Sequence, residues 1–166
     1  NDRVEIADDA AFDFSGGFTA QLWVRPEEIA TSGIISQYSN ADKAFSAVLT
    51  SSGKLEFTIT TDGSSDQYFE TTGTLSVNEW THIAFTYDGS VMKTYINGVE
   101  DATNKTVSGT MHNSSAEIEV ASRDGAFHYK GRIDELSFIG RALSGSEILN
   151  GISCKISLST TNLIAA

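Results

Sequence analysis

The stretch NEWTHIAFTYDG, residues 78–89, decides the fold class of this 166-residue chain. Within it Ile83, Phe85 and Tyr87 alternate with small or polar residues, which places the large apolar side chains on one face of an extended strand. The Asp-Gly pair at its end tolerates the left-handed backbone of a tight hairpin turn. The stretch therefore predicts a half-buried antiparallel strand followed by a turn.

The same alternation occurs on both sides of this stretch. Residues 18–24 and 55–60 carry apolar side chains at every second position. Short turn signals in which glycine follows Ser, Asp or Asn separate such segments, at 52–53, 62–63, 88–89, 97–98 and 124–125. Pro26 is expected to end its strand, because proline cannot donate a ladder hydrogen bond.

One segment alone is predicted to be helical. Ser144 and Glu147 have the spacing of a capping box, and Gly151 is the expected stop signal. The chain is therefore predicted to be all-β, a two-sheet antiparallel sandwich with one short helix near the C-terminus. We expect one domain over residues 1–150, followed by an edge strand or linker over 151–166.

Composition excludes several partners. Twenty-two acidic residues against 11 basic ones give a net charge of -11, which repels nucleic acid and anionic membrane surfaces. No apolar run approaches the roughly 18–20 residues that a membrane span needs. The single cysteine, Cys154, cannot form an internal disulfide and is expected to be inert.

Five motifs then follow one another along the chain, at residues 18–26 (FTAQLWVRP), 78–89, 95–98 (YING), 131–136 (GRIDEL) and 141–148 (RALSGSEI). In this order and spacing they resemble the laminin-G-like domains of the concanavalin-A-like lectin/glucanase superfamily. The resemblance covers about residues 4–150 and implies a two-sheet antiparallel jelly roll. It leaves function open, because the superfamily includes lectins, enzymes and protein-binding modules.

The resemblance also defines what an enzyme would need. Laminarinase-like members carry Glu-x-Asp-x-x-Glu on one strand, since two carboxylates must flank the scissile glycosidic bond. The nearest match here is Glu117-Ile118-Glu119, with Glu in place of Asp and no third carboxylate. We therefore expect a solvated strand face and no enzyme activity, with a glycoside hydrolase as the third alternative.

Calcium is the cofactor that the resemblance implies, at two places. Asp134 of the penultimate strand would share one structural ion with Asp9 of the N-terminal segment. Asp42 with Asp124 would form a pentraxin-type site, although Lys43 replaces the expected Asn. The alternative for each aspartate is a turn or cap role, which is favoured for the second site.

Ligand-binding residues are predicted where aromatic rings and planar polar groups occur together in loops, the chemistry that sugar recognition uses. Segments 66–70 and 123–130 offer that mixture. The predicted ligand residues are Gln67, Tyr68, Arg123, Asp124, His128 and Tyr129.

Some of these aromatic residues must instead pack into the core. Strand alternation buries either Tyr68 or Phe69, and either Phe127 or Tyr129 is expected to be a packing residue. Trp23 and Trp80 are both expected in the core, because their strand motifs explain them.

The sequence thus predicts a non-catalytic carbohydrate-binding or adhesion module, extracellular or at the cell surface and part of a larger protein. Its partner would be a polysaccharide or glycan, or a cell-surface protein. The leading alternative is a protein-binding or spacer module.

Overall fold

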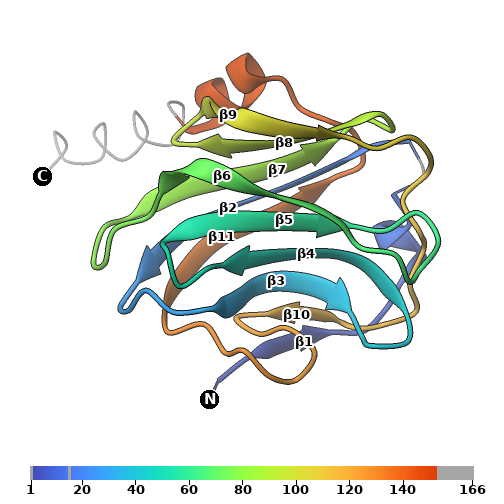
Figure 1. The fold of residues 1–166 in the computed structure, drawn as a ribbon, viewed down its shortest axis with the longest axis horizontal. Coiled ribbons are helices and arrows are strands. Elements are labelled where there is room, and N and C mark those ends of the chain that lie inside the picture. The colour runs from blue at the N-terminus through green and yellow to red at the C-terminus, as the bar shows by residue number, and fades with distance from the viewer. Residues whose placement is uncertain (1, 15, 153–166) are drawn as a thin grey trace, which may run out of the picture.

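A computed structural model of the chain describes residues 2–14 and 16–152. They form two stacked antiparallel sheets, which confirms the predicted jelly-roll sandwich (Figure 1). The six-stranded sheet has the order β1 (Val4–Ile6), β10 (Ile118–Val120), β3 (Ser32–Tyr38), β4 (Lys43–Leu49), β5 (Lys54–Ile59) and β6 (Gln67–Thr74). The five-stranded sheet has the order β11 (Gly131–Ile139), β2 (Phe18–Pro26), β7 (Thr81–Tyr87), β8 (Val91–Ile96) and β9 (Val99–Thr106).

Aromatic contacts between the sheets form the centre of the core. Phe18 of β2 meets Phe45 of β4 at 4.9 Å between ring centroids, and Phe57 of β5 meets Phe85 of β7 at 5.2 Å. All four side chains are buried. Burying one such side chain contributes about 1.5–3 kcal/mol, so these pairs fix the two sheets face to face.

Asp101 closes the sandwich where β6 and β9 lie side by side. Its carboxylate accepts hydrogen bonds from the backbone N–H of Thr72 at 3.0 Å, Gly73 at 2.9 Å and Thr103 at 2.9 Å. Burial alone would raise the pKa of Asp101, but the donors from Thr103, Thr72 and Gly73 outweigh it and hold the pKa well below its usual range. One side chain thus ties an edge of the six-stranded sheet to an edge of the five-stranded sheet.

The helix spans residues 145–152 and packs on the outer face of the five-stranded sheet, where Ile148 and Ile152 contact a cluster around Tyr95. The predicted capping box is confirmed: the Ser144 N–H donates to Glu147 Oε2 at 2.9 Å, and the Glu147 N–H donates to Ser144 Oγ at 3.3 Å.

The predicted stop at Gly151 is wrong, because the burial of Ile152 holds the helix through the glycine and outweighs its low helix propensity. The edge strand or linker predicted over 151–166 therefore begins inside this helix, and the remainder of that segment, with Cys154, lies outside the described residues. The division into 1–150 and 151–166 stays a prediction.

β2 ends at Pro26, as predicted. A short 3-10 helix, η1 (Ala10–Phe12), connects β1 to β2. Within the described part of the chain, no helix is long and apolar enough to cross a membrane.

Candidate functional site

The predicted ligand loop, residues 123–130, is built around a two-residue turn. Asp124 and Gly125 have φ of 54° and 64°, the pair of positive values that a type I′ turn requires. The backbones of Arg123 and Ala126 close the turn with hydrogen bonds of 3.2 Å and 3.0 Å. Glu119 of β10 accepts the Gly125 N–H at 2.9 Å, which anchors the turn to the six-stranded sheet.

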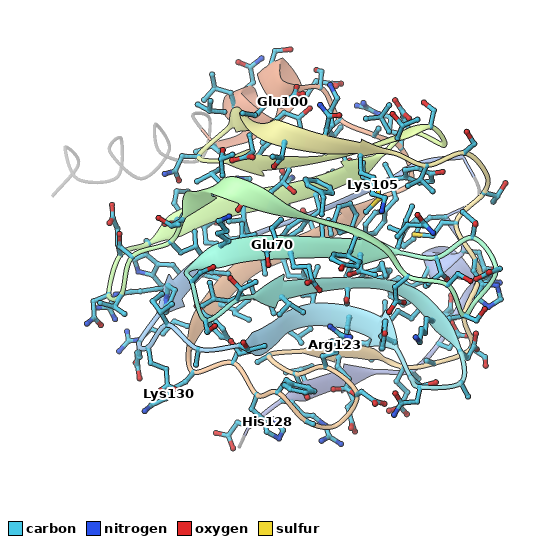
Figure 2. All side chains as sticks on the ribbon, viewed as in Figure 1. Glu70, Glu100, Lys105, Arg123, His128 and Lys130 are labelled. Carbon is cyan, nitrogen blue, oxygen red and sulfur yellow. The ribbon has the colours of Figure 1, made fainter. Side chains whose placement is uncertain are left out.

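The loop lies directly against β3. Gly33 donates its N–H to the Phe127 carbonyl at 2.6 Å, and a Cβ at Gly33 would come within 2.5 Å of the carbonyl carbon of Ser122. Only glycine allows this close approach of two backbones. The approach directs Arg123 onto the outer face of the six-stranded sheet (Figure 2).

We call Tyr38, Glu56, Tyr68, Lys105 and Arg123 the outer-face cluster. The Arg123 guanidinium carbon lies 4.3 Å from the centre of the Tyr38 ring, and its Nη1 lies 3.8 Å from Glu56 Oε1. Burial raises the pKa of the Glu56 carboxyl, and Arg123 opposes that rise. The Arg123 guanidinium therefore lies over an aromatic ring and beside a half-buried carboxyl.

Tyr68 presents the exposed aromatic ring of the cluster. Its side chain is 55% exposed, with Lys105 Nζ 5.6 Å from the ring centre. Phe69 is the residue of the pair that packs inward, against Phe57 at 6.4 Å. Alternation along β6 places Gln67 on the same side as Phe69, so Gln67 lies apart from the cluster.

Of the pair Phe127 and Tyr129, Tyr129 is the packing residue, and its ligand role stays a prediction. It is only 7% exposed and belongs to the core, whereas Phe127 is 56% exposed. The Tyr129 ring lies within 2.8 Å of where a Cβ of Gly131 would stand, so the missing side chain there makes room for the ring. Burial raises the pKa of the Tyr129 phenol well above its usual range.

The remaining predicted loop residues separate into two cavities. His128 and Tyr129 line one of about 650 Å³ beside β1, together with Arg3 and Lys130. Asp124 lines another of about 330 Å³, together with Asp42 and Glu119. The loop therefore contributes Arg123 to the outer-face cluster, while its neighbours face elsewhere.

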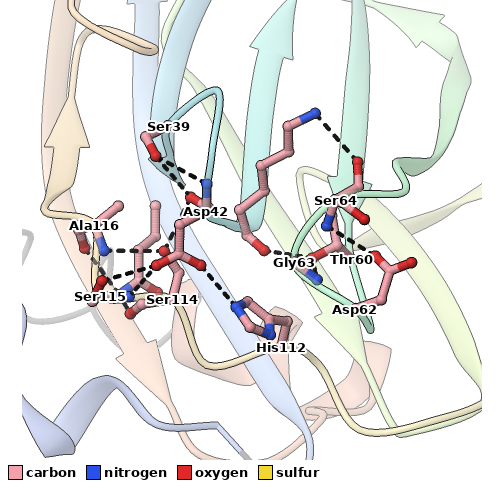
Figure 3. Close-up of polar contacts among 12 residues, drawn as sticks. Ser39, Asp42, Thr60, Asp62, Gly63, Ser64, His112, Ser114, Ser115 and Ala116 are labelled. Carbon is pink, nitrogen blue, oxygen red and sulfur yellow. Dashed lines mark hydrogen bonds and ion pairs between the residues drawn. The ribbon is translucent and has the colours of Figure 1, made fainter.

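The smaller cavity brings together the residues of the expected pentraxin-type calcium site, Asp42 and Asp124. Asp42, however, uses both carboxylate oxygens within the protein (Figure 3): Oδ1 lies 2.8 Å from His112 Nε2, and Oδ2 accepts the Ser115 N–H at 2.8 Å. Burial alone would raise the pKa of Asp42, but the hydrogen bonds from Ser115 and His112 outweigh burial and hold that pKa below its usual value. Asp42 here pairs with groups of the protein itself, which is the alternative to calcium binding that the sequence offered.

The other expected calcium ligands lie apart. Asp9 caps η1 by accepting the Ala11 N–H at 2.9 Å, and Asp134 accepts the N–H of Glu135 at 2.8 Å. Across residues 2–14 and 16–152, no group of three or more His, Cys, Asp or Glu side chains is arranged to hold a metal ion. The calcium ion therefore stays a prediction from sequence.

Glu117 and Glu119, the residues of the hydrolase alternative, line the same 330 Å³ cavity as Asp42 and Asp124. Both oxygens of Glu119 are within 3.2 Å of the Gly125 N–H, so this carboxylate anchors the turn. The described geometry therefore gives Glu119 a structural role.

Trp80 is not in the core, which corrects the expectation that both tryptophans are buried there. It is 42% exposed and, with half-buried Trp23, lines a cavity of about 240 Å³ on the five-stranded sheet. Trp80 precedes the first residue of β7, so the periodicity of the strand does not determine its burial.

Sequence reasoning also missed three members of the outer-face cluster. Tyr38 and Glu56 lie on strands separated by β4, and Lys105 comes from the other sheet. Only strand register, which one sequence does not give, places them beside Arg123 and Tyr68.

The chain belongs to the family described as concanavalin A-like lectin/glucanases superfamily, whose laminin G-type profile matches residues 1–149. Among curated proteins none matches it. Solved structures share the fold. A heptameric SAP-like pentraxin from Limulus polyphemus has 18% identity and a TM-score of 0.62, over 89% of this chain and 79% of the pentraxin.

Two further structures share the fold. Domain 4 of the extracellular arabinanase AbnA from Geobacillus stearothermophilus, solved in complex with arabinotriose, has 23% identity and a TM-score of 0.66, over 89% of this chain and 71% of that one. A structure of botulinum neurotoxin type C, a toxin whose cell entry depends on interaction with two ganglioside molecules, has 18% identity and a TM-score of 0.69, over 92% of this chain and 39% of the toxin chain. The chain therefore spans about two fifths of that toxin structure.

Proposed function

We propose that this chain is a non-catalytic carbohydrate-binding module, secreted or displayed at the cell surface, and that the outer-face cluster binds the glycan. The observation that carries the proposal is the Arg123 guanidinium, whose carbon lies 4.3 Å from the Tyr38 ring centre, on the same sheet face as the 55% exposed ring of Tyr68. Aromatic faces cover the apolar C–H faces of sugars, while guanidinium and carboxylate groups hydrogen-bond hydroxyls in fixed directions.

The cluster offers these groups in a rigid arrangement. Arg123 is fixed by Tyr38 and Glu56, and its backbone is fixed by the anchored turn. Little side-chain entropy is lost when such a residue meets a ligand, which favours affinity. The arabinotriose complex of a structurally similar domain supports the same class of ligand.

Protein binding is the second candidate. Phe127, 56% exposed at the loop and with φ of 44°, offers an apolar contact of the kind that protein interfaces use. A structurally similar toxin domain was solved in complex with rat synaptotagmin II, and that complex supports protein binding as the second candidate.

A glycan array followed by calorimetric titration separates these candidates. We expect Arg123→Ala to weaken glycan binding at least about tenfold, or 1.4 kcal/mol. Lys130→Ala is the matched control, because Lys130 is an exposed cation paired with Glu28 at 3.2 Å and lies outside the cluster. Equal affinity of the two variants, or silence across plant, algal and animal glycans, would contradict the proposal.

A further inference from the structure

A second cavity of recognisable chemistry lies on the opposite sheet. It has a volume of about 240 Å³ and is lined by Trp23, Trp80, Asp134 and Glu135, which we call the tryptophan groove. Both tryptophans of the chain are in it. Since aromatic rings are strongly driven out of water, an indole that is 42% exposed beside a second indole is a recognition feature.

Neighbouring residues fix the Trp23 indole and the chain segment before Trp80. The Trp23 ring meets the His82 ring edge-on at 5.4 Å between centroids. The segment before Trp80 is tied to the end of β2, because Asn78 donates its N–H to the Pro26 carbonyl at 2.7 Å and Arg25 Nε donates to the Asn78 carbonyl at 3.0 Å. The groove is thus formed by packed strands and an anchored turn.

A β-bulge brings two consecutive carboxylates into the groove. Successive side chains of a regular strand point to opposite faces, yet Asp134 and Glu135 line the same cavity. The register of β11 against β2 shifts between Asp134 and Ser137, and Glu135 has φ of 53°. A left-handed residue other than glycine is strained, and bulges that re-aim side chains are concentrated at functional sites.

We propose that the tryptophan groove is a second binding site, specific for a neutral saccharide, independent of the outer-face cluster. A sugar ring packs its C–H face on Trp80, and its hydroxyls donate hydrogen bonds to Asp134 and Glu135. Arg25 and Arg132 are paired two residues along β2 and β11 from Trp23 and Asp134, which places two cations on the same sheet face as the two carboxylates. That balance favours a neutral ligand over a cationic one.

Tryptophan fluorescence reads this groove selectively, since it holds both indoles of the chain. We would titrate the protein with arabinotriose, xylotetraose and cellotetraose, and with tetramethylammonium chloride as the cationic probe. The expected result is a saturable change of emission with at least one saccharide, retained in Arg123→Ala. Calorimetric affinity for that saccharide should fall at least tenfold in Trp80→Ala and remain unchanged in Val77→Ala, an exposed apolar residue of the same turn.

Glu135→Gly keeps the test valid if Trp80→Ala is unstable. Glycine adopts positive φ without strain, which offsets the loss of the side chain's own contacts, so this variant should stay folded with a cooperative melting transition while its saccharide affinity falls several-fold. The proposal is overturned if no saccharide changes the emission, if tetramethylammonium alone saturates it, or if Glu135→Gly binds as tightly as the wild type. Loss of the emission change in Arg123→Ala would also overturn it and leave the outer-face cluster as the sole site.

Discussion

Replacing Asp101 by asparagine perturbs the closure between β6 and β9 without changing the shape of the side chain. Oδ1 accepts from the backbone N–H groups of Thr72 and Thr103, and Oδ2 accepts from the backbone N–H of Gly73 at 2.9 Å. The asparagine amide keeps one acceptor and turns an NH2 group toward at least one of these donors. A backbone N–H is then left unpaired in a partly buried edge.

The expected loss of stability follows from the one backbone hydrogen bond that the asparagine cannot accept. Hydrogen bonds to charged groups contribute about 1.5–3 kcal/mol, and a partly buried donor left unpaired loses a similar amount, so we expect a net loss of about 2–3 kcal/mol at pH 7. For a chain of this size each 1 kcal/mol moves the melting temperature by roughly 2–4 °C, which predicts a fall of roughly 4–12 °C.

The effect also depends on pH in a predictable direction. The folded pKa of Asp101 is held below its usual value, so its ionised carboxylate stabilises the fold above the ordinary aspartate pKa of about 3.9. That contribution is lost as the pH falls from there toward the folded pKa. The difference between the wild type and Asp101→Asn should therefore be full at pH 7 and shrink below about pH 4.

Urea denaturation at pH 7, 5 and 3.5 measures both quantities. Glu79→Gln serves as the control, because Glu79 is an exposed carboxylate in the turn before β7. A loss at pH 7 within about 0.5 kcal/mol of the control, or a loss that is the same at pH 3.5, would refute this account of the edge.

Three further predictions concern the site. Tyr129→Ala should destabilise the protein by about 3 kcal/mol or more and Tyr68→Ala by less than about 0.5 kcal/mol, because Tyr129 is 7% and Tyr68 55% exposed; equal melting temperatures would contradict this. If calcium binds through Asp134, a free calcium concentration about 100 times the dissociation constant stabilises the protein by about 2.7 kcal/mol. EDTA and Asp134→Ala should each remove that stabilisation. A melting curve insensitive to EDTA would exclude the calcium site. Reducing-end assays on polysaccharides should detect no cleavage by the wild type, whereas cleavage that Glu119→Gln abolishes would support the hydrolase alternative.

Much of the fold could be predicted because it depends on local patterns. Alternation in residues 81–87 is a property of one strand, and turn pairs such as Asp124-Gly125 carry their own backbone preference. The prediction failed where tertiary contacts decided the outcome. The helix continues through Gly151 because Ile152 packs on the five-stranded sheet, which local propensity does not contain.

The candidate site was less predictable for the same physical reason. Alternation shows that Tyr68 and Phe69 lie on opposite faces, but it does not show which face is inside. Contact of Arg123 with Tyr38 and Glu56 requires the register of three strands and the close approach at Gly33. A strand pattern also assigns Asp134 and Glu135 to opposite faces, and only the bulge at this position unites them.

The central claim is that the outer-face cluster binds a carbohydrate, and amide NMR tests it most directly. The ¹⁵N-labelled protein would be titrated with the glycan that binds most tightly on the array, with the backbone signals of Glu56, Tyr68 and Arg123 followed to saturation. The account predicts that these three signals shift with one common dissociation constant, and that Arg123→Ala weakens that constant at least tenfold. The claim would be contradicted if the signals of all three residues stayed fixed at saturating glycan while signals elsewhere moved.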